Sequence, residues 1–357
     1  MSPNSTQVEY VLNENEYEKI FRSNLSKEET DIELPEERKY KYRWGFIVYL
    51  SLFHIQAVYG IYLSFTSAKL LTTIFGTALH FVALFAITAG AHRLWSHRAY
   101  KATWQLKLIL VICQTLSFQG SVYRWCRDHR IHHKYTDTDA DPHNSRRGVF
   151  YSHIGWILVE RHPQYVEKIK LIDFSDLKND PLLKFQIRYY YQLLFLLCFL
   201  LPTIVPWFFW NETFKNSWFI CVCSRYILTL NAVWLVNSWA HIWGTQPYDT
   251  RSSGRESFFS SLMTVGEGWH NFHHTFPWDY RASELCGYLV NPTMILLQLF
   301  AKIGWAYDLK TVSDDMIRKR INRTGDGSHS TGIWGWGDHE QSDDNKSFVK
   351  IEYKKQL

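Results

Sequence analysis

Three short segments of the chain hold a dense set of histidines. Residues 129–133 read HRIHH and residues 270–274 read HNFHH, so the spacing H-x-x-H-H occurs twice. Residues 92–97 read HRLWSH and add two more imidazoles. These histidine boxes contain eight of the 16 histidines of the chain. Because positions i, i+3 and i+4 share one face of a helix, each H-x-x-H-H box presents three imidazoles to one side.

The chemistry that uses clustered imidazoles is metal binding. Neutral imidazole suits iron, zinc, copper and nickel. His241, four residues after Asn237, adds a ninth ring at the end of an apolar run. Nine imidazoles exceed the needs of one ion, which predicts two metals. A catalytic zinc site keeps about three protein ligands, so an all-histidine, two-metal site beside a lipid bilayer favours redox iron.

The remaining histidines are interpreted differently. Three lie between the boxes and are expected on the surface or behind the ligands: His143, His153 and His162. His329 and His339 lie near the C-terminus and are expected to take no part in metal binding.

Four apolar stretches must position these boxes. Each approaches the roughly 20 residues that a helix needs to cross a bilayer, and they span residues 44–65, 70–91, 189–210 and 217–239. Short connections predict two hairpins, so the long polar segments share one side of the membrane. A soluble all-α protein is the alternative, but four such segments are hard to bury in one small core.

Charge and cysteine usage indicate which side this is. Arg38, Lys39, Lys41 and Arg43 precede the first span, and the positive-inside tendency makes their side cytosolic. The N-terminus has no apolar stretch that predicts a cleaved signal peptide. The six cysteines form no C-x-x-C pair, which favours a reducing compartment and no disulfide scaffold. The net charge of +5 is too scattered to indicate nucleic-acid binding.

The predicted fold is therefore an all-α integral membrane protein with four transmembrane helices in two hairpins and a cytosolic, His-rich cap. In chain order, the expected segments are a cytosolic N-terminal segment (1–43), a first hairpin (44–91), a first cap segment (92–188), a second hairpin (189–239), a second cap segment (240–312) and a flexible cytosolic tail (313–357). Within the second cap segment, the apolar run 285–304 is expected to form a helix that lies on the membrane or against the cytosolic domain.

Four segments together resemble the membrane acyl-CoA desaturases of the stearoyl-CoA desaturase type, and the insect members most of all. They read HRLWSH, RDHRIHHKYTDTDADPHN, WLVNSWAH and GEGWHNFHHTFPWDYRASE, and the resemblance covers residues 36–310. It implies a cytosolic cap with two Fe²⁺ ions above four transmembrane helices. It further implies that O2 and electrons from cytochrome b5, reduced by an NADH-dependent reductase, introduce a cis double bond into a saturated fatty acyl-CoA.

The resemblance also implies roles for individual residues. One iron would be held by His92, His97, His129, His133 and His273. The other would be held by His132, His241, His270 and His274, with a water bound to Asn237. The acyl-CoA would contact Arg127, Asp128 and Trp234, and Arg161 would face the CoA phosphates. His80 and Leu84 on the second span are the expected floor of the acyl tunnel, and Val82 is a further candidate.

This sequence departs from the family pattern at three places. Glu160 stands where a basic residue is usual, and Gly120-Ser121 replaces a common Asn-Asp or Asn-Ser after Phe-Gln. Trp239 stands where alanine is usual and lies close to the predicted metal site. These changes affect the surroundings of the site, and none removes a predicted ligand.

Two other kinds of protein share some of the pattern. A membrane di-iron hydroxylase or an acyl-lipid desaturase also carries histidine boxes, but the RDHRIHH context favours the acyl-CoA form. A metal transporter usually places its ligands within the spans, whereas these boxes lie outside them. The C-terminal KKQL resembles an endoplasmic-reticulum retrieval signal, which predicts a multi-pass protein of that membrane with both termini in the cytosol.

Overall fold

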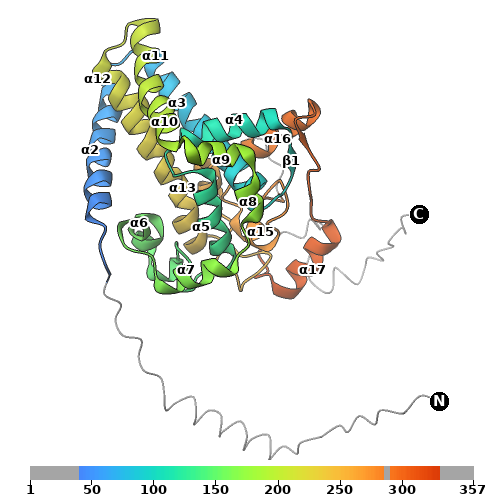
Figure 1. Cartoon of the computed structure of the whole chain (residues 1–357). Coiled ribbons are helices and arrows are strands. Elements are labelled where there is room, and N and C mark those ends of the chain that lie inside the picture. Colours follow the sequence, from blue (N-terminus) through green and yellow to red (C-terminus); the bar gives the residue numbers. More distant parts are fainter. Residues whose placement is uncertain (1–39, 285–289, 330–357) are drawn as a thin grey trace, which may run out of the picture. The chain divides into compact units, whose positions relative to one another are not determined.

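The computed structural model of the chain is mostly helical and describes residues 40–284 and 290–329. The chain divides into the units Met1–Lys41 and Tyr42–Leu357, and every element below belongs to the second unit (Figure 1). The predicted N-terminal segment, Cys286, His339 and the C-terminal KKQL lie outside the described residues, apart from residues 40–43.

Four apolar helices are long enough to cross a membrane, which confirms that element of the prediction. They run from Trp44 to Thr66, Leu70 to Ser96, Tyr190 to Trp210 and Phe214 to Ile242. Their segments are α2 (Trp44–Thr66); α3 (Leu70–Phe85) and η1 (Ala86–Ser96); α10 (Tyr190–Leu194), η5 (Phe195–Leu200) and α11 (Leu201–Trp210); and α12 (Phe214–Ser217), η6 (Trp218–Ser224) and α13 (Arg225–Ile242).

The second and fourth helices extend beyond their predicted ends, at residues 91 and 239, because their polar last turns pack inside the protein. Residues 86–96 of η1 are all buried, including Arg93. The fourth helix is central, with 67% of its most apolar window buried against 22% for the first. His92 and His241 are therefore carried by two of the four long apolar helices, the second and the fourth.

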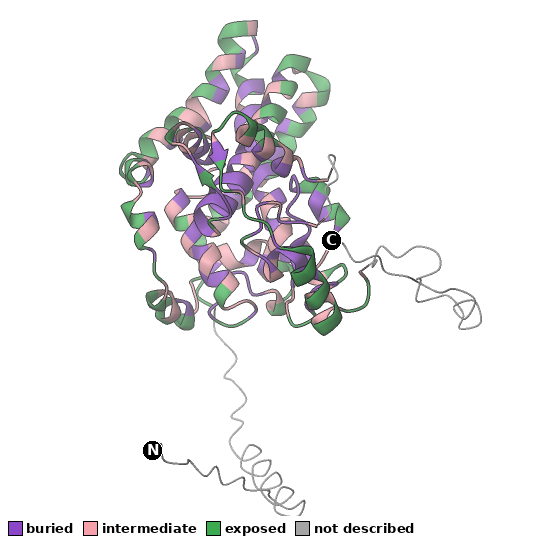
Figure 2. Cartoon of the chain, turned by 90° about the vertical axis from the view of Figure 1, so that its right-hand side faces the viewer, coloured by how far each residue is buried: buried purple, intermediate pink, exposed green. Residues whose placement is uncertain are grey.

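Close backbone contact joins the first and fourth helices. A Cβ added at Gly60 would lie 2.1 Å from the Phe219 carbonyl oxygen and 2.3 Å from Ser224 Oγ. Small residues permit this approach between apolar helices. The outer faces carry exposed apolar side chains such as Phe65 (87% exposed), and Figure 2 shows the exposed residues along these helices. Apolar outer faces on helices of spanning length are typical of lipid contact.

Shorter helices surround the polar ends of the long ones. Between the second and third long helices are β1 (Lys101–Ala102), α4 (Trp104–Thr115), α5 (Val122–Lys134), η2 (Ser145–Arg147), η3 (Tyr151–Gly155), α6 (Trp156–Leu158), α7 (Pro163–Lys168), η4 (Ile169–Leu171), α8 (Ser175–Asn179) and α9 (Pro181–Arg188). After the fourth are α14 (Phe258–Met263), α15 (His270–Thr275), α16 (Pro292–Lys302), β2 (Ala306–Tyr307) and α17 (Asp314–Thr324). The two strands form an antiparallel pair.

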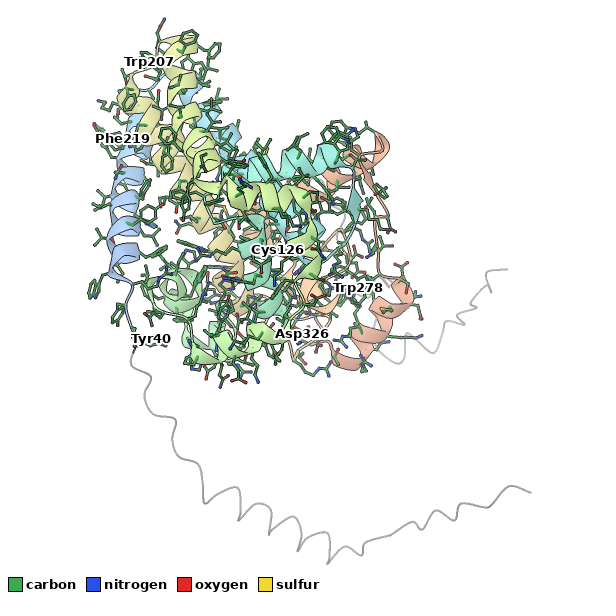
Figure 3. The ribbon with its side chains drawn as sticks, in the orientation of Figure 1. Tyr40, Cys126, Trp207, Phe219, Trp278 and Asp326 are labelled. Carbon is green, nitrogen blue, oxygen red and sulfur yellow. The ribbon has the colours of Figure 1, made fainter. Side chains whose placement is uncertain are left out.

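The helix α5 is fixed in the middle of these shorter helices. Its Cys126 is fully buried, and Sγ donates to the Ala91 carbonyl 3.1 Å away on η1. Figure 3 shows Cys126 among the shorter helices and Phe219 on a long one. The five cysteines in the described ranges are all free. Two of the histidine boxes, on η1 and α5, are thus held against each other by the core.

Two C-terminal segments pack against the rest of the described structure. The segment predicted to be a flexible tail contains α17, whose Ile317 is buried against Phe272 and Phe276. In the apolar run 285–304, the described residues form α16, whose Met294 and Leu297 are buried in the same apolar core as Cys126 of α5. Residues 285–289 are outside the described ranges. The charged composition after Ser313 indicated a solvated segment, but a few apolar side chains at helical spacing are enough to dock it.

Candidate metal centre

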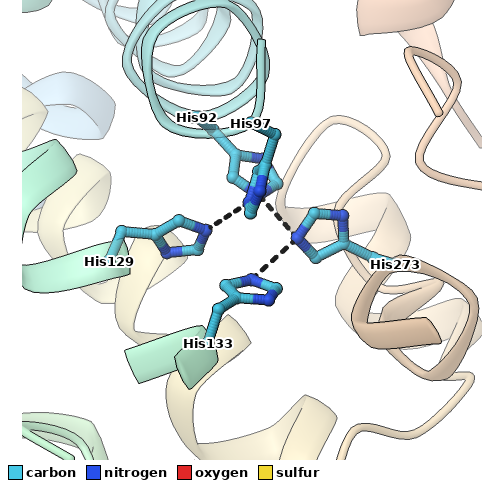
Figure 4. Close-up of side chains that lie close together, drawn as sticks. All are labelled: His92, His97, His129, His133 and His273. Atoms are coloured by element: carbon cyan, nitrogen blue, oxygen red, sulfur yellow. Dashed lines mark hydrogen bonds between the residues drawn. The ribbon is translucent and has the colours of Figure 1, made fainter. Parts of the chain in front are cut away.

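Five imidazoles from three elements converge on one point (Figure 4). Their ligand nitrogens all lie within 4.8 Å of one another, and the residues are His92, His97, His129, His133 and His273. The Nε2 atoms of His92 and His273 are 2.9 Å apart, those of His97 and His129 are 2.8 Å apart, and those of His133 and His273 are 3.0 Å apart. We call this group cluster 1.

A second group of imidazoles lies beside the first. Its ligand nitrogens also lie within 4.8 Å of one another, and the residues are His132, His241, His270 and His274. His270 Nε2 is 3.0 Å from both His241 Nε2 and His274 Nε2. We call this group cluster 2. The two clusters adjoin, since the rings of His133 and His274 stack with centroids 4.3 Å apart.

The spacing of the ring nitrogens fits a metal ion at the centre of each cluster. Metal–imidazole bonds are about 2.0–2.1 Å long, so two ligands at a right angle have nitrogens about 3.0 Å apart. The observed 2.8–3.0 Å separations match that value. Burial and neighbouring histidines hold the pKa of His129 and His273 well below the ordinary value. These imidazoles are therefore neutral, as ligands must be.

The π-helix η1 explains how HRLWSH contributes two rings to cluster 1. His92 and His97 are five residues apart, and on an α-helix that spacing separates side chains by about 140° around the axis. The His97 N–H donates to the His92 carbonyl at 3.2 Å, which is the i→i+5 bond of a π-helix. A π-helix has more residues per turn than an α-helix, so the angle between the His92 and His97 side chains around the axis is smaller and both rings reach cluster 1. π-helical segments inside α-helices often occur at functional sites.

The two H-x-x-H-H boxes each supply both clusters. On α5, His129 and His133 belong to cluster 1 while His132 belongs to cluster 2. On α15, His270 and His274 belong to cluster 2 and His273 to cluster 1. The box on each helix therefore lies across the boundary between the clusters. The i, i+4 pair of α5 points to cluster 1, and the i, i+4 pair of α15 points to cluster 2. The rings are grouped as in the two ligand sets that the family resemblance implies.

Outer hydrogen bonds fix the orientation of three rings. His132 Nδ1 lies 2.9 and 3.0 Å from the two carboxylate oxygens of Asp141, and His241 Nδ1 lies 2.7 Å from Ser253 Oγ. His92 Nδ1 is 2.8 Å from Glu267 Oε2. A partner at Nδ1 leaves the Nε2 lone pair free to face the cluster, which is the usual arrangement for metal-binding histidines.

The buried carboxylate Glu267 is ionised. Burial acts to raise its pKa, but Arg93 and His92 outweigh burial and hold the pKa at about 2. Arg93 Nη2 donates to Glu267 Oε1 at 2.9 Å, and both side chains are almost fully buried. Asp141 and Glu267 were not singled out from the sequence, although both stand within the diagnostic segments around the boxes.

A cavity of about 490 Å³ reaches the clusters. We call it the large cavity, and α2, α5, α6, α10 and α13 contribute to its walls. Along α13 its lining residues are Tyr226, Leu230, Val233, Trp234 and Asn237. That spacing marks one face of the helix over about 16 Å. The large cavity is thus an elongated, mostly apolar space that ends near cluster 1, at His129.

A second cavity of about 40 Å³ continues past the clusters. We call it the small cavity; it shares Trp125, His129, Val233 and Asn237 with the large one and is also lined by Leu84, His132 and His270. The Trp125 ring stacks on His129 with centroids 4.9 Å apart. Asn237 therefore borders both cavities, whereas Leu84 lines the small cavity alone.

The residues expected to contact the substrate fall into two groups. Asp128, Arg161 and Trp234 line the large cavity, whereas Arg127 is not among its lining residues. Asp128 is buried and accepts from Arg161 Nη2 at 2.7 Å and from Arg127 Nη2 at 2.9 Å. Tyr165 also donates to it, at 2.5 Å. Burial acts to raise the pKa of Asp128, but the two guanidinium groups outweigh burial and lower it.

His80 lies one turn before Leu84 on α3 and lines neither the large nor the small cavity. Its Nδ1 is 2.9 Å from Thr229 Oγ1 on α13. This contact bridges the two helices just beyond Leu84. Trp239, which replaces the usual alanine, points toward Trp243 and Phe259, with ring centroids 4.5 and 5.0 Å away.

Three of the other histidines have polar partners for their rings. His153 bonds Ser238 and Asn231, and His162 accepts from the Gln164 N–H. His329 Nε2 is 2.9 Å from Glu284. His143 is 8% exposed and lines the large cavity. It groups with His132 and Asp141, but Asp141 is already engaged by the His132 ring.

Comparison with known proteins decides the family. The sequence model described as Fatty acid desaturase matches residues 68–283. An Acyl-CoA Delta-9 desaturase of Acheta domesticus is 50% identical over 334 residues, which is 92% of either chain. The chain belongs to the fatty acid desaturase family.

Other relatives of this desaturase carry related names. The Stearoyl-CoA desaturase of Homo sapiens is 52% identical over 294 residues, 82% of this chain and 81% of the relative. An Acyl-CoA Delta(11) desaturase of Trichoplusia ni is 49% identical over 318 residues, 89% and 90% of the two chains. The resemblance stated from the histidine boxes is thereby confirmed, and the family is one of oxidoreductases.

Proposed function

We propose that this desaturase introduces a cis double bond into the chain of a saturated fatty acyl-CoA. The reaction removes two hydrogens from adjacent methylenes and, with two electrons, two protons and O2, gives the alkene and two waters. The observation that carries the proposal is the pair of histidine clusters at the meeting point of two cavities. That arrangement exposes one short stretch of a threaded chain to both clusters.

Two Fe²⁺ ions are the proposed cofactors, one in each cluster, with Asn237 holding a water at cluster 2. When bound, they would supply the O2 activation that abstraction of an unactivated hydrogen needs. The residues of the chain bind and orient the substrate and exclude competing reactions. Imidazoles whose orientation is fixed by Asp141, Ser253 and Glu267 favour divalent cations in both clusters.

The acyl chain is proposed to occupy the large cavity, pass the clusters beside Trp125, and end in the small cavity. Holding one methylene pair against the clusters lowers the barrier through orientation. Leu84 would contact the methyl end, and the His80–Thr229 bridge behind it would close the space between α3 and α13. His80 and Leu84 therefore remain the proposed floor of the tunnel.

The head group is proposed to lie at the opposite end of the large cavity. Asp128 holds Arg161 in the cavity wall, so that the guanidinium faces the substrate without a change of rotamer. Trp234 is buried and faces the same space. Arg127 supports Asp128 from behind, which makes its proposed role in acyl-CoA binding an indirect one.

The setting of the reaction follows from the same sequence features. We propose that the four long helices form two transmembrane hairpins and that the shorter helices form a cap on the cytosolic face, with the six segment boundaries given above. Electrons would come from cytochrome b5 and its NADH-dependent reductase. The proposed location is the endoplasmic-reticulum membrane, with both termini in the cytosol.

Expression in a yeast that lacks its own desaturase tests the function. Growth without added unsaturated fatty acid, and new cis alkenes located by mass spectrometry, are the expected result. A hydroxylated product, or activity only on acyl groups already in phospholipids, would favour the di-iron hydroxylase or the acyl-lipid desaturase instead. A variant with His132→Ala serves as the inactive control.

A further inference from the structure

The charged side chains on the wall of the large cavity are unequally paired. Besides histidines, those among its lining residues are Arg124, Asp128 and Arg161. The Asp128 carboxylate accepts from Arg161 and also from Arg127 behind the wall. In the described ranges, no hydrogen bond or ion pair involves the guanidinium of Arg124. One carboxylate is therefore shared by two guanidiniums, and a third cation faces the cavity without a counter-charge.

Arg124 lies where the cavity opens to solvent. It is an exposed residue that also belongs to the lining. Tyr191, at the start of the third long helix, is 81% exposed and lines the same space. Gly45 and Phe46, at the start of the first long helix, line it as well. These residues mark a mouth at the ends of the long helices, where a polar head group can stay in water while an apolar chain enters.

The guanidinium groups near the mouth share one electrostatic neighbourhood. Arg43 donates from Nη1 to the carbonyl of the lining residue Ile157 at 3.2 Å. Its pKa is lowered by burial and then by the charges of Arg124 and Arg161, while the nearby carboxylate of Glu160 acts to raise it. Like charges gathered around an opening attract an anion and raise its local concentration.

Gly120 gives the Arg124 side chain its place. Gly120 has a φ of +84°, and a Cβ there would lie 3.2 Å from Arg124 Cδ and 3.8 Å from Cβ and Cγ. The backbone of Gly120 is fixed on both sides, because its N–H donates to Tyr190 Oη at 3.1 Å and its carbonyl accepts from Gln114 at 3.0 Å. The stem of Arg124 therefore packs over a position where the family pattern commonly has asparagine, whose side chain would compete for that space.

We propose that Arg124, seated over Gly120, binds a phosphate of the acyl-CoA head group at the mouth of the large cavity. This inference rests on the proposed function, since it names the residue that holds the anionic portion of that substrate. Arginine suits the task because its planar fork matches phosphate oxygens. The glycine and the arginine act as one element: the first leaves room, and the second supplies the charge.

Steady-state kinetics of the purified, reconstituted enzyme test the proposal. The substrates are stearoyl-CoA, its 3′-dephospho form and S-stearoyl-pantetheine, which has no phosphate. Arg124→Gln is expected to raise KM for stearoyl-CoA about tenfold, as expected for a lost charge-assisted hydrogen bond, and to leave kcat within about twofold. For S-stearoyl-pantetheine the variant and the wild type are expected to have equal KM. The 3′-dephospho substrate shows which phosphate Arg124 binds. If it binds the 3′-phosphate, Arg124→Gln will not change KM for this substrate; if it binds the pyrophosphate, KM will rise as it does for stearoyl-CoA.

Matched variants separate binding from structure. Arg146→Gln removes an exposed charge that does not belong to the cavity lining, and its KM is expected to equal that of the wild type. Arg124→Lys is expected to recover some of the loss. Gly120→Asn is expected to raise KM as Arg124→Gln does, and the double variant to add nothing further, since both changes remove one contact.

Two outcomes would overturn the proposal. One is an unchanged KM of Arg124→Gln for stearoyl-CoA. The other is an equal loss on stearoyl-CoA and on the pantetheine thioester, which would indicate a structural effect. A wild-type enzyme that desaturates none of the three thioesters would instead contradict the proposed function itself.

Discussion

Replacement of Asp141 by asparagine should weaken metal binding at cluster 2. Asp141 is 2% exposed, and its two carboxylate oxygens face Nδ1 of His132 at 2.9 and 3.0 Å. Oδ2 also accepts from the Asp137 N–H and Oδ1 from the His143 N–H, each at 2.9 Å. Asparagine keeps the shape but turns one oxygen into an NH2 group, so one of these two backbone donors loses its acceptor whichever way the amide turns.

The size of the effect follows from these contacts. An outer-shell partner of a histidine ligand typically contributes 10–100-fold to metal affinity, which corresponds to about 1.4–2.7 kcal/mol. A buried donor left without an acceptor costs about 1–3 kcal/mol more in folding stability. We therefore expect Asp141→Asn to fold, to lose metal from cluster 2 at lower chelator concentrations than the wild type, and to retain the metal of cluster 1.

The assay is metal content per chain, measured by inductively coupled plasma mass spectrometry after dialysis against increasing chelator. Asp139→Asn is the matched control, because Asp139 lies in the same loop and pairs with Arg147 at the surface. The control should follow the wild-type curve. Retention of both metals by Asp141→Asn with wild-type affinity would refute the role assigned to the outer hydrogen bond.

Three further predictions concern the tunnel, a buried ion pair and helix packing. His80→Ala removes the bridge to Thr229, and the product profile in desaturase-deficient yeast should shift toward longer chains; an unchanged profile would reject His80 as a component of the floor. The pKa of Glu267 is lowered from 4.5 to about 2, so its ionised form contributes about 3 kcal/mol of stability above pH 4.5 that is lost as pH falls toward 2. Thermal unfolding should show this loss in the wild type and not in Glu267→Gln, which should be less stable at neutral pH. Gly60→Ala should lower the unfolding midpoint by an amount equivalent to roughly 2 kcal/mol or more, because the new Cβ would lie 2.1 Å from the Phe219 carbonyl oxygen. Gly45→Ala on the same helix is the control; its Cβ would have nothing within 4 Å, so its midpoint should be close to that of the wild type.

The sequence predicted the elements that carry the histidines better than their arrangement. Helical spacing placed each H-x-x-H-H box on one face, and α5 and α15 are helices. That spacing could not say which ring joins which cluster, since i, i+3 and i+4 differ by small rotations that matter only once another helix lies opposite. The separation of His92 and His97 by five residues is unfavourable on an α-helix, and the π-helix that reconciles them has no simple sequence signal.

Features that depend on loops and on packing were not predictable. Asp141 follows His132 by nine residues, and only the turn between them brings the carboxylate back to the ring. The docking of α17 depends on Ile317 joining an apolar cluster that includes Phe272, although the two lie far apart in the sequence. Arg127 was expected to contact the acyl-CoA because it matches a family position, and its guanidinium pairs with Asp128 outside the lining of the large cavity. Arg124, one turn earlier on α5, lines the cavity instead.

The most direct test of the central claim is the metal content of the purified wild-type protein beside that of two single variants. We predict two irons per chain in the wild type. His133→Ala should lose the metal of cluster 1 and His274→Ala that of cluster 2, although the two rings stack on each other, so each variant should retain about one iron. A wild-type protein that binds a single zinc, or no metal at all, would contradict the claim that these nine imidazoles form a di-iron centre.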